Sequence, residues 1–153
     1  MLSKRENIAE YILHLWQLES LVRIAEKQNV SFDDEFLLQL QQMMHTEGVM
    51  DSGHTQIARV ALSEVESLNT ELINTDAIYR AAMMQIVPQL AVLKSKSDNP
   101  SYSDVEMMFI FLYDVMQLRR EGRELSTSTQ TFLNQVQSAV RYLAKTYKTQ
   151  SEQ

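Results

Sequence analysis

Apolar residues recur every three or four positions along almost the whole chain, and few helix-breaking residues interrupt them. This spacing places apolar side chains on one face of an α-helix, whereas the strands of a half-buried sheet would show strict alternation. The 153 residues include 3 glycines and 2 prolines, too few for the many turns that a sheet of this length needs. The pattern therefore predicts an all-α fold.

The first two helices are predicted from their apolar stripes and from the residues that flank them. One stripe spans about Lys4 to Lys27. A second helix is expected to start after an N-cap at Ser31, to bury Phe36 and its apolar neighbours, and to stop at Gly48.

Two further stripes occupy residues 55–96 and nearly join. Three consecutive poor helix formers, residues 74–76, favour a break between them, although one long helix stays an alternative. Pro88 lies inside the later stripe and is expected to kink that helix or to start a new one.

The last two helices are predicted to begin at serine caps. Ser103 is followed three residues later by Glu106, the spacing of a capping box, and Ser126 precedes the final stripe. Because the connections are short, neighbouring helices are expected to be antiparallel. The sequence thus predicts an up-and-down bundle of five or six amphipathic helices, a single domain over residues 1–153 with a frayed tail at 148–153.

Composition excludes several classes of function. With 20 acidic and 14 basic residues the net charge is −6, which disfavours a nucleic-acid partner. The longest strongly apolar run, residues 107–113, is far too short to span a membrane. The chain has no cysteine, so a reducing cytoplasm is the expected compartment. No nucleophile elbow or phosphate-binding glycine loop occurs, so we expect no cofactor and favour a protein that is not an enzyme.

Four polar residues fall on apolar stripes, where a charged group must be hydrogen-bonded or it destabilises the fold. Glu19 points to the middle of the apolar face of the first helix. The other three lie at the apolar edges of three other helices, at Glu47, His54 and Arg119. Glu47 and His54 flank one connector and are expected to lie close together.

Two interpretations of these four residues stay open. One is a structural network that ties one end of the bundle together. The other is a small-ligand or metal site, since carboxylates and imidazole suit zinc, iron or manganese. The sequence lacks the Glu-x-x-His pair of a di-metal bundle, so no metal ligand is assigned.

The first helix is apolar beyond its main stripe, which bears on possible partners. Leu13, Trp16, Leu21 and Ile24 all lie off that stripe. A helix that is apolar over much of its circumference is either central in its own bundle or buried in a partner. The main functional hypothesis is a helical interaction or scaffold protein, self-associating or bound to an unknown protein partner.

Three stretches carry a resemblance to a known family: residues 6–19 (ENIAEYILHLWQLE), 43–57 (MMHTEGVMDSGHTQI) and 112–119 (LYDVMQLR). On these stretches the chain resembles a family of uncharacterised, all-helical proteins from Bacteroidetes, described as a domain of unknown function. The resemblance implies a cytoplasmic helical protein and no particular activity, and it assigns no role to any residue.

Overall fold

The computed structural model describes residues 3–153, and these residues form six helices and no strand. The all-α fold expected from the apolar spacing is therefore confirmed. The helices are α1 (Ile8–Lys27), α2 (Glu35–Glu47), α3 (Gln56–Thr75), α4 (Ala77–Lys96), α5 (Asp104–Arg120) and α6 (Thr127–Ser151).

Most helices begin at a side chain that caps their free amide groups. Ser103 and Ser126 accept hydrogen bonds from the amides of Glu106 and Thr129, as predicted. The prediction of an N-cap at Ser31 is wrong. Asp34 caps α2 instead, because its carboxylate accepts a hydrogen bond from the amide of Leu37 at 2.9 Å.

The first helix also starts later than its apolar stripe indicated. Its N-cap is Asn7, whose side chain accepts a hydrogen bond from the amide of Glu10 at 3.1 Å. The residues from Lys4 to Glu6 form a turn and are not part of the helix. The cap holds the chain in an extended conformation at Asn7, which ends the helical geometry there.

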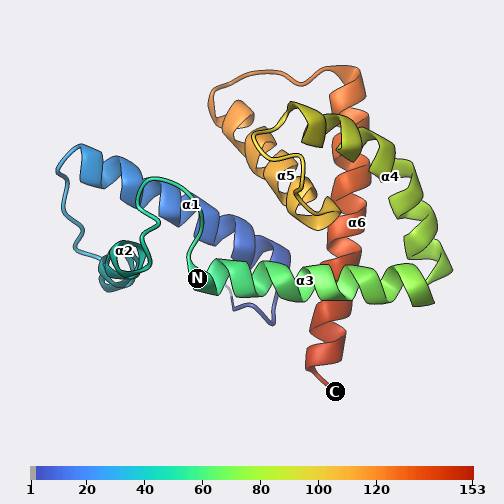
Figure 1. The fold of residues 1–153 in the computed structure, drawn as a ribbon, viewed down its shortest axis with the longest axis horizontal. Coiled ribbons are helices and arrows are strands. Elements are labelled where there is room, and N and C mark those ends of the chain that lie inside the picture. Colours follow the sequence, from blue (N-terminus) through green and yellow to red (C-terminus); the bar gives the residue numbers. More distant parts are fainter. Residues whose placement is uncertain (1–2) are drawn as a thin grey trace.

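The boundaries inside the chain follow local chemistry. Gly48 ends α2 with a φ of 71°, the left-handed conformation that glycine adopts without strain. Asp76 separates α3 from α4 and caps the second of them, so the predicted break is confirmed. Helix α4 continues through Pro88 and is visibly curved (Figure 1).

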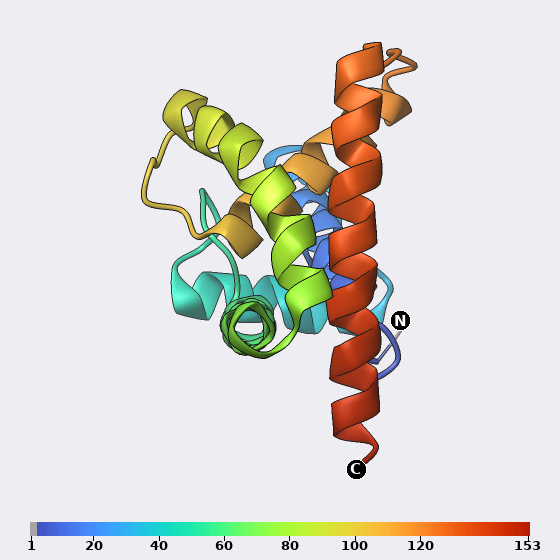
Figure 2. The same ribbon diagram turned by 90° about the vertical axis from the view of Figure 1, so that its right-hand side faces the viewer.

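The helices pack crosswise around one main core. Helix α6 runs across α3, while α4 and α5 lie against both of them (Figures 1 and 2). The N-terminal part of α1 closes the core, which includes Ile12, Leu15, Phe109 and Val136 as fully buried side chains. Residues 148–151, for which we expected fraying, are helical and extend α6.

A second, smaller core joins α2 to α1. It contains Val22, Leu40 and Met44, and α2 packs mainly against α1 (Figure 1). Because one neighbouring helix covers only a narrow stripe of α2, Phe36 stays exposed, and its predicted burial is wrong. Among the described residues, no helix has the length and apolarity required to cross a membrane.

Candidate functional site

The carboxylate of Glu19 is fully buried where α1 meets the start of α3. Its Oε2 atom accepts hydrogen bonds from the amide of Thr55 at 2.9 Å and from the Thr55 hydroxyl at 2.7 Å. Its Oε1 atom lies 2.7 Å from Nδ1 of His54, which donates to it. Three donors thus replace the water that burial removes from this carboxylate.

The donors belong to the N-terminus of α3, where the first amide groups of the helix have no partner within it. The Thr55 side chain makes no capping bond to α3, because its hydroxyl is directed to Glu19. The next amide, that of Gln56, donates to Glu47 at 2.7 Å. Two carboxylates from two different helices therefore meet the positive end of the α3 dipole.

The imidazole of His54 is fixed on two sides. Its ring stacks on the indole of Trp16, with centroids 4.4 Å apart and an angle of 10° between the planes. Trp16 in turn meets the edges of Phe109 and Tyr113. The other ring nitrogen, Nε2, takes no part in the bond to Glu19, and no described side chain hydrogen-bonds to it. The ring is partly open to solvent.

Arg23 holds the connector that carries His54. Its guanidinium donates to the carbonyl of Val49 at 2.8 Å and to that of Gly53 at 2.5 Å. Gly53 has a φ of 88°, so the chain turns there in a conformation that favours glycine. The clamp places His54 and Thr55 against α1.

The four residues singled out by the sequence therefore fall into two places. Glu19, Glu47 and His54 gather at the start of α3, where each has a hydrogen-bonding role. Arg119 lies elsewhere, at the end of α5, where its guanidinium makes a long contact of 3.5 Å to Gln130. Within residues 3–153, no three histidine or acidic side chains are arranged to hold a metal ion.

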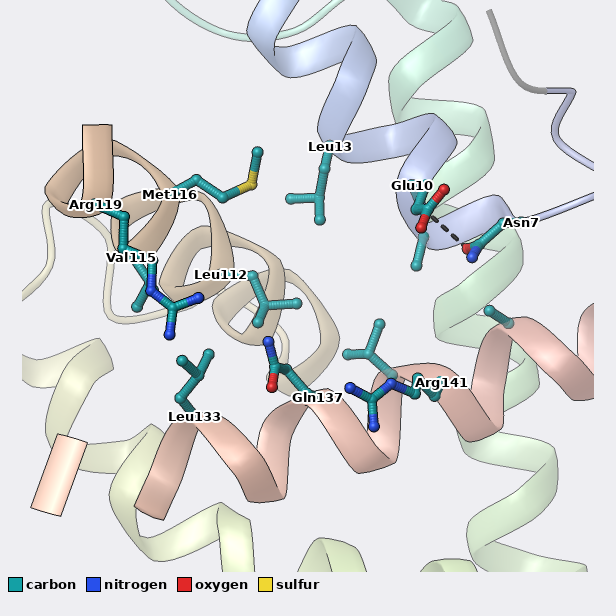
Figure 3. A pocket seen from close by; sticks show the side chains of 13 residues that line it. Asn7, Glu10, Leu13, Leu112, Val115, Met116, Arg119, Leu133, Gln137 and Arg141 are labelled. Carbon is teal, nitrogen blue, oxygen red and sulfur yellow. Dashed lines mark hydrogen bonds between the residues drawn. The ribbon is translucent and has the colours of Figure 1, made fainter. Parts of the chain in front are cut away.

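Arg119 lines a groove between the first turns of α1, the end of α5 and the middle of α6 (Figure 3). The groove has a volume of about 270 Å³, and its floor is apolar. Arg141 and Gln137 enter it from α6. The residues that form its apolar part include Leu13, Leu112, Val115, Met116, Leu133 and Val140.

Comparison with known proteins adds a family but no activity. A family model described as a domain of unknown function, DUF4924, matches residues 24–153. The chain belongs to this family. No curated protein and no solved structure matches the chain. The segment that matches DUF4924 contains Glu47, His54 and Arg119, and it starts five residues after Glu19.

Several residues of these two sites were not predicted from the sequence. Thr55 follows the predicted connector and directly precedes a predicted helix, where a threonine commonly caps the first amide groups. This position could have marked Thr55 as a partner for Glu19. Gln137 and Arg141 are four residues apart and so share a helix face, next to the apolar stripe of α6. Nothing in the sequence relates these two residues to Arg119, because their place in the same groove depends on how α5 packs on α6.

Proposed function

We propose that this protein is a helical interaction protein without enzymatic activity that self-associates through the outer side of α4. The single observation that carries the proposal is an exposed surface without charge on this helix. We call it the α4 face. It consists of Ala77, Ile78, Ala81, Met84, Gln85, Pro88, Ala91 and Val92, all of which are exposed.

The exposure of the large apolar residues on the α4 face is unusually high for side chains of this kind. Ile78 is 78% exposed and Met84 is 70% exposed. The two charged residues between Ala77 and Ser95 are held by other parts of the protein. Arg80 donates to the carbonyl of Ile73, and Lys94 pairs with Asp104 at 2.5 Å.

The spacing on the α4 face suits a second helix. Ala77, Ala81, Met84, Pro88 and Ala91 alternate in steps of four and three residues, as in a helix-pairing seam. Three of these five side chains are alanine, which lets two helix axes approach closely.

A second copy of the same helix, laid antiparallel about a point between Met84 and Gln85, is complementary to this face. Ile78 then lies opposite Ala91 of the other copy, and Ala77 lies opposite Val92. Large side chains therefore meet small ones at both ends of the contact. This self-complementarity is what a two-fold interface requires.

Charge also favours contact between two copies through the α4 face over contact through their other surfaces. The chain carries a net charge of −6, so two copies repel each other over most of their surfaces. The α4 face adds nothing to this repulsion. The off-stripe residues of α1 support the proposal less strongly, because Trp16 is buried in its own fold and only Leu21 and Ile24 are exposed.

A ligand site that uses all four predicted polar residues has less support, since Arg119 lies apart from Glu19, Glu47 and His54.

We also propose a cytoplasmic location, because a chain without cysteine needs no oxidising compartment. Because the chain resembles Bacteroidetes sequences, we propose that the protein is bacterial.

Cysteine cross-linking tests the interface directly, because the natural chain contains no cysteine. We expect Gln85→Cys to form a disulfide-linked dimer under mild oxidation, since this position lies next to the two-fold axis. Leu38→Cys, at an exposed apolar position of α2, is the matched control and is expected to form no disulfide-linked dimer.

Sedimentation over a range of concentrations gives the second measurement. We expect a dimer whose dissociation constant rises at least about tenfold in Met84→Glu, because that change buries an unpaired charge. Leu38→Glu should leave the dissociation constant unchanged. A natural chain that sediments as a monomer at every concentration would contradict the proposal.

A further inference from the structure

The groove between α1, α5 and α6 combines an apolar floor with two arginine heads that no acidic side chain neutralises. Neither Arg119 nor Arg141 has an acidic group within ion-pair distance among residues 3–153. Figure 3 shows both guanidinium groups directed into the space between α5 and α6, with the amide of Gln137 between them.

A structural role of the two arginines, in which they cover the apolar core, explains only part of their placement in the groove. Leu112 and Leu133 line the groove and are buried, and the hydrocarbon stems of long charged side chains commonly cover residues of this kind. That role does not require two cationic heads from different helices to enter the same hollow. Like charges that share one hollow repel each other unless an anion lies between them.

The first turn of α1 adds to the positive field. Asn7 and Ala9 line the groove at the N-terminal end of this helix, where the helix dipole is positive. One acidic residue, Glu10, also lines the groove, so its charged lining is two arginines and one carboxylate. A net positive hollow is notable in a chain of net charge −6.

We infer that this groove binds a small amphiphilic anion, in which one oxyanion group is joined to a short apolar body. Arg119 and Arg141 hold the oxyanion by charge-assisted hydrogen bonds, and the Gln137 amide donates a further one. The apolar body lies on Leu112, Val115 and Leu133. The volume of about 270 Å³ lies just below the usual range for ligand pockets, so the ligand is a short molecule and not a long lipid chain.

Titration calorimetry with four defined probes tests both halves of this inference. Octanoate and octyl phosphate carry an oxyanion and an apolar body, whereas octanol lacks the charge and inorganic phosphate lacks the body. We expect at least one of the two amphiphilic anions to bind about tenfold or more tightly than octanol and inorganic phosphate. The tighter of the two identifies the head group as a carboxylate or a phosphate.

Variants then locate the binding site. Arg119→Gln and Arg141→Gln are each expected to weaken the better probe about tenfold or more, because each removes a charge-assisted contact. Both residues are exposed, so the fold should persist, as circular dichroism would show. Arg59→Gln, at an exposed position of α3 outside the groove, is the control and should bind like the natural chain.

Three results would overturn the inference. The first is octanol binding as tightly as octanoate and octyl phosphate, which would leave no role for the arginines. The second is unchanged binding in both groove variants. The third is an equal loss in Arg59→Gln, which would indicate nonspecific attraction to positive charge.

Discussion

The imidazole of His54 lies flat on the indole of Trp16, while its Nδ1 atom donates to the buried carboxylate of Glu19. One side chain from the connector before α3 thus contacts α1 in two different ways. The stack covers a face of the one tryptophan in the sequence, which makes Trp16 fluorescence a direct reporter of this contact.

Replacing His54 by alanine should open the covered face of Trp16 to solvent. We expect faster quenching of its fluorescence by acrylamide and a loss of about 1–3 kcal/mol in the free energy of unfolding, since a hydrogen bond to a buried carboxylate is also lost. His14→Ala, at a half-buried position of α1, is the control. Unchanged quenching in His54→Ala would show that the ring does not cover Trp16 in solution.

Glu19→Gln should be more damaging, although it keeps the size of the side chain. An amide has one acceptor oxygen and turns an NH₂ group toward a donor, so the His54 or Thr55 group loses its partner. We expect the free energy of unfolding to fall by about 2–4 kcal/mol in urea denaturation. Glu124→Gln, an exposed change of the same type, should have almost no effect.

Thr55→Val separates the two contacts that Thr55 makes with Glu19. This change removes the hydroxyl donor and leaves the amide donor in place, so the loss should be smaller, about 1–2 kcal/mol. A loss as large as that of Glu19→Gln would mean that the hydroxyl alone supports the carboxylate.

Glu64 should stabilise the protein mainly above acidic pH. Burial by itself raises the pKa of Glu64, but hydrogen bonds from Tyr147 and Lys4 outweigh it, and the pKa lies below its usual value near 4.5. The folded state therefore favours the carboxylate, and this contribution is present above the unfolded pKa and is lost as pH falls through the folded pKa. In thermal melts, Glu64→Gln should be less stable than the natural chain at pH 7, and the difference should shrink at pH 3.

Glu106 should behave in the opposite way. Burial and the nearby carboxylate of Glu66 raise the pKa of Glu106, while His54 partly opposes them. The folded state favours the protonated form, so stability from this group is present below the unfolded pKa and is lost as pH rises through the folded pKa. Glu106→Gln should therefore raise the melting temperature at pH 7 and leave it nearly unchanged at pH 4. A lower melting temperature at pH 7 would refute this.

The position of Glu19 was predictable because a helical wheel needs only the sequence of one helix. Its partners were harder to predict, because they depend on how the connector before α3 folds back onto α1. Asp34 was missed as a cap since Ser31 offers the same chemistry three residues earlier. The separation of Arg119 from Glu19 follows from the packing of α5, which the spacing of apolar residues does not describe.

The small core between α1 and α2 implies that the protein does not open as a single cooperative unit. Few buried side chains hold α2, and its end is joined to α3 through the contact of Glu47 with the Gln56 amide. Amide hydrogens of α2 should exchange with solvent through a local opening of low free energy. Those of α3 should exchange only when the whole protein unfolds. Glu19 and its donors belong to the slowly exchanging part of the protein, so the hydrogen bonds of Glu19 should persist when α2 opens locally.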